Sequence, residues 1–183
     1  MNDNEYKRCF IGIFLPKEAI NEIKRIQETV KKKNFFIGKF IELENLHLTL
    51  KFLGEIDNNK INEVRGRLRK INFRGFEASF DEIGVFSKKF IKILWIKLAG
   101  VDELQKQIDS VLENLFNKEE RFMSHLTIAR VKNVYDKKGF LEYLESLKCK
   151  KLGFKINSFY LMESELKPEG PIYREIEKYR LES

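Results

Sequence analysis

The sequence is poor in cysteine, proline and glycine, and it has no long apolar run. It contains two Cys, three Pro and ten Gly among 183 residues, which excludes collagen-like and linker-like compositions. An apolar share of 43% excludes an intrinsically disordered chain, because there is ample apolar surface to bury. No apolar run approaches the roughly 18–20 residues that span a bilayer, so we expect no membrane partner.

The two cysteines, Cys9 and Cys149, are far apart and lack C-x-x-C spacing. This usage is typical of reduced thiols in a cytosolic protein rather than of a disulfide framework. The apolar stretch at 9–15 is too short for a secretory signal, and charged residues flank it on both sides. We therefore expect a cytoplasmic protein.

The chain carries an excess of positive charge. Lys and Arg number 35 against 28 Asp and Glu, which gives a net charge of +7 and a pI near 9.3. Such charge attracts phosphate groups and is compatible with a nucleic-acid partner. Each basic run also ends or lines a predicted helix, where solvated lysines are ordinary. Charge alone therefore favours a nucleic-acid partner only weakly.

The order of predicted elements indicates an α+β fold with antiparallel strands, because strands and helices do not alternate strictly. A length of 183 residues suits a single domain over 1–183, with two lobes if the chain is duplicated. We predict strands at 8–15, 37–43, 46–53, 75–86, 90–99, 121–132, 152–163 and 172–180, helices at 17–33, 59–71, 101–116 and 136–147, and a turn-rich loop that includes Glu165, Lys167, Pro168, Gly170 and Pro171.

One short motif occurs twice. The chain's only histidines, His47 and His125, each precede a threonine by two residues, in LHLTL and SHLTI. The sequence has three threonines, so chance fills both positions with a probability of about 2 in 10,000. On a strand, residues i and i+2 share a face, so we expect His47, Thr49, His125 and Thr127 to line one cleft. The spacing of 125 − 47 = 78 residues suggests two duplicated lobes related by an approximate two-fold axis.

Two imidazoles suit the cleavage of a phosphodiester. With a reference pKa of about 6.5, one can accept a proton from the nucleophile while the other donates a proton to the leaving oxygen. Threonine hydroxyls can donate hydrogen bonds to the non-bridging phosphate oxygens as charge builds. Two histidines with distant cysteines make a poor zinc site, so we expect no metal and no other cofactor. The alternative for each motif is an ordinary hydrogen-bonded histidine at a sheet edge.

The motifs and their surroundings resemble the two-histidine (2H) phosphoesterase superfamily. Within it, the chain is similar to the RNA 2′,3′-cyclic phosphodiesterases, historically also called 2′-5′ RNA ligases. The segments that carry the resemblance, in the family's order, are RCFIGIFLP, ENLHLTLKFLGE, IGVFSKKFIKILWIKL, SHLTIARVK and SELKPEGPIY. The resemblance implies a bilobal fold in which each lobe's antiparallel sheet offers one motif to a central cleft, with helices outside.

The resemblance also implies an activity, which is hydrolysis of a terminal RNA 2′,3′-cyclic phosphate to a 2′-phosphate without a metal. The partner would be the end of a tRNA or of a short oligonucleotide, and we expect a monomer. Carried onto this chain, His47 would protonate the departing O3′ and His125 would activate the attacking water. Thr49 and Thr127 would hold phosphate oxygens. Arg130, three residues after the second motif's threonine, matches a family arginine that would bind the phosphate or the base.

Three candidate substrate contacts can also be interpreted in other ways. Strict alternation places Arg130 on the face opposite His125, unless the strand ends or bulges there or the side chain reaches round the rim. Its other interpretation is a surface ion pair. Lys51 shares the face of His47 by alternation, and it would either contact substrate or be a solvated rim charge. Phe10 would either stack on a base or pack in the core, which is the usual place of a strand phenylalanine.

The sequence leaves two other functions open. The same acid and base could run the reverse reaction and join RNA ends through a 2′-5′ bond. Water at about 55 M competes with the ribose hydroxyl that this reaction needs, so hydrolysis is favoured. From a different class, a catalytically idle RNA-binding module would bind RNA in a salt-dependent way and would need neither histidine.

Overall fold

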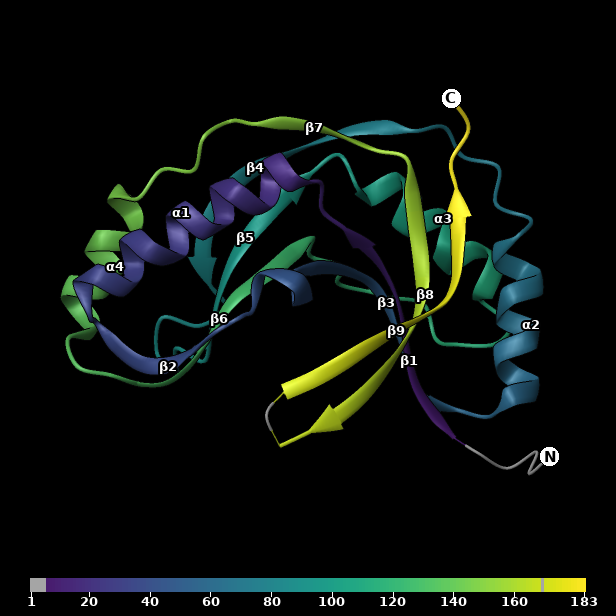
Figure 1. Cartoon of the computed structure of the whole chain (residues 1–183), viewed down its shortest axis with the longest axis horizontal. Helices are drawn as coiled ribbons and strands as arrows, with labels where there is room; N and C mark the ends of the chain where they lie inside the picture. The colour runs from purple at the N-terminus through teal and green to yellow at the C-terminus, as the bar shows by residue number, and fades with distance from the viewer. Residues whose placement is uncertain (1–5, 169) are drawn as a thin grey trace.

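Two antiparallel sheets form the centre of the computed structural model, which describes residues 6–168 and 170–183 (Figure 1). Residues 1–5 and 169 of the predicted domain lie outside the described residues. The first sheet has the order β3-β1-β8-β9, with bounds His47–Ile56, Lys7–Phe14, Ser158–Lys167 and Gly170–Arg180. The second has the order β2-β6-β5-β4-β7, with bounds Phe36–Phe40, His125–Val134, Ile93–Ala99, Phe76–Val85 and Gly153–Ile156. Neighbouring strands pair antiparallel throughout both sheets, which confirms the predicted α+β class.

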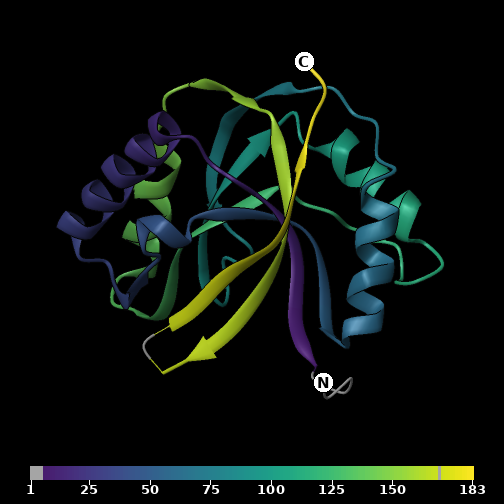
Figure 2. The same cartoon turned by 45° about the vertical axis from the view of Figure 1, so that its right-hand side comes forward.

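Helices cover the outer sides of the two sheets. Their bounds are Lys17–Lys33 for α1, Asn58–Leu68 for α2, Asp102–Leu112 for α3 and Lys137–Ser146 for α4, and a short 3₁₀ turn spans Leu43–Asn45. Figures 1 and 2 both show α1 and α4 on one side of the molecule and α2 and α3 on the other. Among the described residues, no helix has the length and apolar character needed to cross a membrane.

The two halves of the chain exchange elements. β1 and β3 begin the first sheet, but β4, which follows α2, joins the second sheet beside β5. In the same way β5 and β6 belong to the second sheet, and β8, which follows α4 and β7, joins the first sheet beside β1. The helices cross over as well, since α1 packs against β6 and α3 against β3. This reciprocal arrangement agrees with the predicted two-fold duplication.

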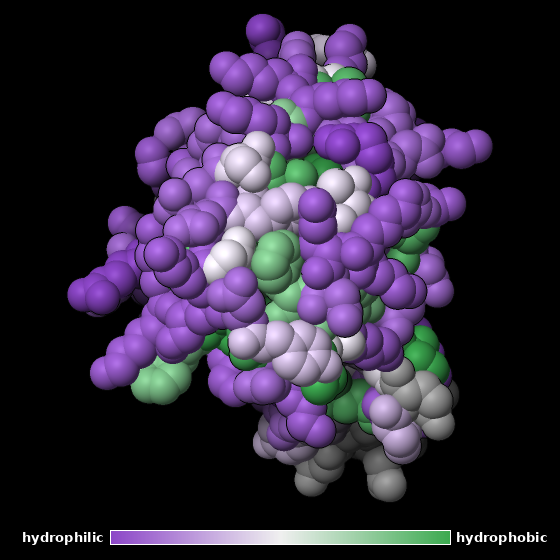
Figure 3. Space-filling model, turned by 90° about the vertical axis from the view of Figure 1, so that its left-hand side faces the viewer, coloured by the Kyte–Doolittle hydropathy of each residue, from purple (hydrophilic) through white to green (hydrophobic). Residues whose placement is uncertain are grey.

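Buried apolar side chains from both sheets form one continuous core. The helical spacing of apolar residues in α1 places Ala19, Ile23, Ile26 and Val30 inside, as the sequence predicts. The surface seen in Figure 3, on the side where α1 and α4 lie in Figure 1, is mostly hydrophilic and shows apolar residues only in small patches.

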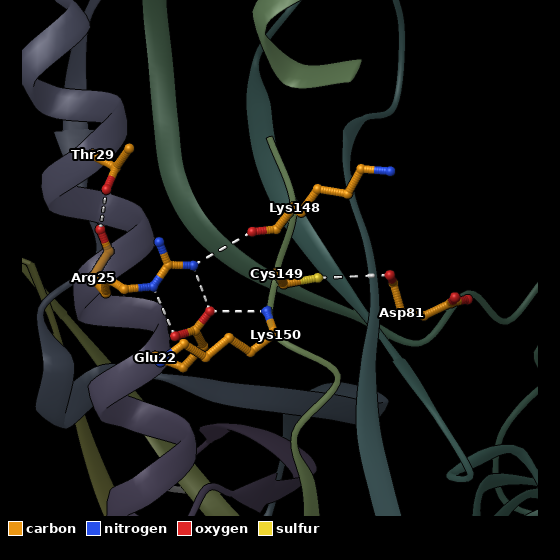
Figure 4. A network of polar contacts seen from close by, with 7 residues as sticks. All are labelled: Glu22, Arg25, Thr29, Asp81, Lys148, Cys149 and Lys150. Carbon is orange, nitrogen blue, oxygen red and sulfur yellow. Dashed lines mark hydrogen bonds and ion pairs between the residues drawn. The ribbon is translucent and has the colours of Figure 1, made fainter. Parts of the chain in front are cut away.

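A polar network fastens α1 to the segment between α4 and β7 (Figure 4). Glu22 is buried on α1 and accepts hydrogen bonds from Arg25, at 2.8 Å from Nε and 2.6 Å from the terminal nitrogen. The Lys150 N–H donates to the same carboxylate at 3.0 Å. The hydrogen bonds from Arg25 hold the pKa of Glu22 below its usual range, against the effect of burial. Cys149 in this segment and Cys9 in β1 are both free thiols.

The largest error in the predicted elements concerns 152–163, which is not one strand. The structure divides this stretch at Asn157 into β7, which pairs with β4 in the second sheet, and β8, which pairs with β1 and β9 in the first. Each strand buries alternate side chains, but the alternation shifts at the division: β7 buries Phe154 and Ile156, whereas β8 buries Phe159 and Leu161. The shift marks a break in the strand, but periodicity does not tell which sheet each part joins.

The predicted loop between the two terminal strands is shorter than the sequence indicates. Lys167 ends β8 and Gly170 begins β9, so Glu165, Lys167, Gly170 and Pro171 lie in the two arms of a long hairpin. Gly170 has φ of 148°, which suits a residue without a side chain at the start of the returning arm. Some ends also differ: α3 stops at Leu112 rather than at 116, and β6 starts at His125 rather than at 121.

Candidate active site

The two His-x-Thr motifs lie at the beginning of β3 and of β6, and they line the same cleft. His47 is the first residue of β3, and His125 is the first residue of β6. Together with Thr49 and Thr127 they line a cavity of about 560 Å³. The structure thus brings together the four residues that the strand pattern assigns to one cleft.

Each motif strand contains a β-bulge three residues after its histidine. In β3, Thr49 is opposite Gly12 of β1 and Lys51 is opposite the adjacent residue, Ile11. Leu50 is therefore left without a partner residue on β1. A bulge interrupts the alternation of side chains, so two consecutive residues point to the same face and the alternation resumes after them in the opposite phase. Leu50 and Lys51 are consequently both buried beneath the sheet.

The same insertion occurs in β6. Thr127 is opposite Trp95 of β5 and Ala129 is opposite Leu94, so Ile128 has no partner residue on β5. The fifth residue after each histidine therefore returns to the cleft face. In β3 this residue is Phe52 and in β6 it is Arg130, and both line the cleft. Of the arrangements that the sequence allowed for Arg130, the bulge is the correct one.

The prediction that Lys51 shares the face of His47 is wrong, because the bulge turns its side chain into the protein. Lys51 is only 3% exposed, and its ammonium group forms an ion pair with Asp109 of α3 and donates to the Asn117 carbonyl at 2.8 Å. Burial opposes ionisation of Asp109. Hydrogen bonds from Lys51, the Glu119 N–H and Gln105 outweigh that effect and hold its pKa below the usual range. Lys51 therefore ties β3 to α3.

A glutamine of α1 supports the bulge in β6. The Gln27 side-chain amide is buried and donates to the carbonyls of Ile128 and Ile41, each at 2.9 Å. The Ile41 N–H also donates to the Ile128 carbonyl at 3.0 Å. Each bulge thus has a buried polar side chain beside it from the helix that covers its sheet, Gln27 of α1 at β6 and Asp109 of α3 at β3.

Both imidazoles are held in the same way by the main chain. Nδ1 of His47 lies 2.8 Å from the Asn45 carbonyl oxygen, and Nδ1 of His125 lies 2.9 Å from the Met123 carbonyl oxygen. A carbonyl oxygen can only accept, so Nδ1 carries a hydrogen in both rings. In the neutral form of each ring, Nε2 is then the nitrogen without a hydrogen.

Aromatic rings surround His47. The ring centroids of Phe10, Tyr173 and Phe14 lie 4.7, 4.8 and 5.9 Å from that of its imidazole. Phe10 lines the cleft, as the sequence predicts for a substrate contact, but it is only 4% exposed. Its ring packs against His47 and Tyr173 rather than presenting an open face to a base.

These surroundings lower the pKa of His47 below that of an ordinary histidine. Burial is the main cause, and the hydrogen bond to the Asn45 carbonyl opposes it. The positive charge of Arg130 and the neighbouring His125 lower the pKa further. His47 is therefore a neutral imidazole at neutral pH when the cleft holds no anion.

The charged residues of the cleft favour an anion. Arg8 and Arg130 line it, and none of its lining residues among those described is acidic. The Arg8 guanidinium carbon lies 4.6 Å from the ring centroid of Phe52, which is 49% exposed. Within residues 6–168 and 170–183, no group of three or more His, Cys, Asp or Glu could hold a metal ion.

Sequence reasoning gave no role to Arg8 or to Tyr173, although both line the cleft. Each comes from a strand without a motif: Arg8 from β1, beside β3, and Tyr173 from β9, in the C-terminal hairpin. The only signal for them was their position in RCFIGIFLP and SELKPEGPIY, two of the segments that carry the resemblance.

The family model for LigT-like phosphoesterases matches residues 13–95 and, a second time, residues 98–173. Each match contains one His-x-Thr motif. The chain belongs to the LigT-like phosphoesterase family. The resemblance to the 2H phosphoesterases is thereby confirmed, and the two consecutive matches agree with an internal duplication.

Relatives in this family match over most of the length of the chain. It is 36% identical to a Methanocaldococcus jannaschii protein named RNA 2′,3′-cyclic phosphodiesterase, over 94% of this chain and 99% of the relative. A Methanothermobacter thermautotrophicus protein of the same name is 33% identical, over 95% and 98%. The crystal structure of Escherichia coli LigT complexed with 3′-AMP shares the fold, with a TM-score of 0.77 and 21% identity over 98% and 100% of the two chains.

Removing the glutamine that supports the β6 bulge is predicted to destabilise this LigT-like phosphoesterase. Gln27→Met leaves the Ile41 carbonyl and part of the Ile128 carbonyl without a buried donor, so we expect a loss of about 1–3 kcal/mol in the free energy of unfolding. Urea denaturation measures it. Glu28→Met, which makes the same side chain at the next, exposed position, is the control and should change stability by less than about 0.5 kcal/mol. Equal effects of the two substitutions would contradict the assignment.

The influence of Arg130 on His47 can be measured by NMR titration. The chain has only two histidines, so two imidazole Cε1–H signals report both pKa values, and His47→Asn assigns them. Arg130→Gln removes a positive charge near His47, and we expect the pKa of His47 to rise. Arg8→Gln removes a positive charge elsewhere in the cleft and should raise it less. A larger rise in the Arg8 variant would contradict this assignment, because Arg8 rather than Arg130 would then be the stronger influence on the pKa of His47.

Proposed function

We propose that the chain hydrolyses a terminal RNA 2′,3′-cyclic phosphate to a 2′-phosphate without a metal. One observation carries the proposal: two imidazoles, each with Nδ1 held by a main-chain carbonyl, share a cationic cleft that no described acidic residue lines. This arrangement supplies one acid, one base and an anion site, which is what displacement at a phosphodiester needs. The names of the relatives at 36% and 33% identity support the same reaction.

The proposed reaction uses Nε2 of each histidine. His125 accepts a proton from water as the water oxygen forms a bond to phosphorus. The bond between phosphorus and O3′ breaks, and His47 donates its Nε2 proton to O3′. The product carries a 2′-phosphate and a free 3′-hydroxyl, and proton exchange with solvent restores the two rings. The hydrogen bonds to the carbonyls of Asn45 and Met123 keep Nε2 of each ring available for these steps.

Three other side chains contact the phosphate in this proposal. Thr49 and Thr127 follow their histidines on the same strand face, so their hydroxyls donate to the non-bridging oxygens. Arg130 lines the cleft from β6 and neutralises the charge that builds on the phosphate. The approximate two-fold relation of the motifs supplies one hydroxyl from each sheet.

The lowered pKa of His47 means that the bound substrate itself promotes protonation of this ring. The free protein holds His47 neutral, and a neutral ring has no Nε2 proton to donate. A bound cyclic phosphate places a negative charge beside the ring, which favours the protonated form. Binding of the substrate therefore charges His47 for its role as the acid.

The proposed substrates are RNA ends, either of tRNA or of short oligonucleotides, in the cytoplasm. The cleft opens between sheets of one chain, and both histidines come from that chain. A monomer is therefore sufficient for the proposed reaction. The reverse joining of RNA ends would use the same two groups, and an added 5′-hydroxyl oligonucleotide would report it as a longer product.

Replacing either histidine should greatly reduce turnover. With a 2′,3′-cyclic nucleotide as substrate and EDTA in the buffer, we expect His47→Ala and His125→Ala each to lower kcat by about 10²–10⁴-fold, because each ring performs one proton transfer. Thr49→Val and Thr127→Val should lower kcat by about 10²-fold. Thr29→Val is the matched control: this third threonine hydrogen-bonds within α1 and should not affect kcat. Full activity of either histidine variant would overturn the mechanism, and loss of wild-type activity in EDTA would overturn its independence of metal.

A modified leaving group separates the two histidine roles. A substrate with sulfur in place of O3′ leaves as a thiolate and needs little protonation, so the acid becomes dispensable while the base does not. We expect His47→Ala to regain most of the wild-type rate with this substrate and His125→Ala to remain inactive. The opposite pattern would exchange the two roles and leave the overall reaction unchanged.

A further inference from the structure

The connection between β4 and β5, residues 86–92, begins beside the imidazole of His125. The Phe86 ring meets the His125 ring edge to face, with centroids 4.8 Å apart, and Phe86 is 52% exposed. Ile93, directly after the connection, lines the cleft. The segment FSKKFIK therefore begins and ends beside the proposed reaction site while its middle lies at the surface.

The middle of this connection combines an exposed ring with positive charge. Phe90 is 66% exposed, and the Lys89 ammonium nitrogen lies 5.4 Å from its ring centroid. The Phe90 N–H donates to the Ser87 hydroxyl at 3.1 Å, which closes a turn beneath the ring. A phenylalanine held at the surface by such a turn contributes little to the core and leaves its ring open to solvent.

Hydrogen bonds attach this connection to the end of β6 and to the first turn of α4. The Val131 N–H donates to the Lys92 carbonyl at 2.8 Å, and the Lys137 ammonium donates to the Lys89 carbonyl at 3.1 Å. Tyr135, two residues before Lys137, is also exposed. We call this surface the 86–92 face, and its cations are Lys88, Lys89, Lys92, Lys132, Lys137 and Lys138.

We propose that the 86–92 face binds the single-stranded RNA that precedes the terminal cyclic phosphate. Bases would stack on the exposed rings of Phe86 and Phe90, and the lysines would contact the phosphates between them. Alternating aromatic rings and cations suit a single strand, because its bases are free to stack and its backbone is anionic. The inference rests on the proposed function, which places the 3′ end of an RNA beside His125.

The position of the face favours RNA over other anionic partners. A chain whose terminal phosphate lies in the cleft must leave it over a neighbouring surface, and the 86–92 face adjoins the cleft at both Phe86 and Ile93. It carries six lysines, two of which form ion pairs: Lys88 with Glu145 at 3.2 Å and Lys138 with Glu142 at 3.9 Å. This surplus of positive charge complements a phosphate backbone.

The experiment compares two substrates that share the same reacting group. One is a 2′,3′-cyclic mononucleotide, and the other is a single-stranded oligonucleotide that ends in a 2′,3′-cyclic phosphate. For Phe90→Ala we expect KM for the oligonucleotide to rise about 5- to 100-fold, as for loss of one stacked base, with kcat unchanged. KM for the mononucleotide should not change. Phe90→Tyr keeps a stacking ring and should restore the wild-type KM.

The contribution of the lysines is tested by salt dependence. Lys89→Ala removes one phosphate contact, so the slope of log KM for the oligonucleotide against log salt concentration should fall by about 0.7. Lys70→Ala is the matched control, because Lys70 is also exposed but follows α2, which lies across the molecule from α4 (Figure 1). The control should leave both the slope and KM unchanged.

The outcomes separate the two proposals. Wild-type protein that turns over neither substrate overturns the proposed function and this inference with it. Turnover of both substrates, with the same oligonucleotide KM in wild type and Phe90→Ala, overturns this inference alone. An equal loss on both substrates in Phe90→Ala would also overturn it, because the ring would then act on the reaction site rather than on the RNA chain.

Discussion

One unpaired residue in each motif strand decides what the cleft contains. Leu50 in β3 and Ile128 in β6 interrupt the pairing with the neighbouring strand, and the fifth residue after each histidine returns to the cleft face. The insertion brings Arg130 to the cleft and sends Lys51 into the protein. Buried polar side chains stand beside both insertions: Gln27 donates to the carbonyl of Ile128, and Asp109 pairs with Lys51, which follows Leu50. The chemistry of the cleft therefore depends on hydrogen bonds made on the other side of the sheet.

The two motifs have equivalent backbones but different surroundings. Both histidines hold Nδ1 on the carbonyl of the second residue before them, so their main-chain geometry is the same. Three aromatic rings surround His47, whereas Phe86 is the aromatic contact of His125. A symmetric scaffold thereby places its two imidazoles in different surroundings, and burial lowers the pKa of His47 below the usual range of a histidine.

The sequence predicts the class of fold and the centre of the site well. Helix α1 has the predicted bounds because Pro16, the apolar spacing and the final lysines are all local signals. The meeting of His47 and His125 follows from strand alternation and from a motif that uses every histidine in the chain. These features are encoded in a few consecutive residues, which a single sequence displays directly.

What the sequence could not predict depends on partners far along the chain. Lys51 reads as a cleft residue until Asp109, 58 positions away, is placed beside it. The division of 152–163 between two sheets depends on β4 and β1, neither of which is adjacent in sequence. Tyr173 reaches His47 only because the C-terminal hairpin returns across the first sheet. Periodicity carries no information about such pairings.

The reciprocal exchange of β4 and β8 has a consequence for how such a fold can arise. A chain that contained only the first half would have β1 without β8, and its own β4 would have no β5 beside it. Two copies of that half could complete each other only by giving each other their last strand. The ancestral unit would then be an intertwined homodimer with two identical motifs. Joining the copies end to end frees each motif to change by itself, and one histidine can be enclosed while the other stays open.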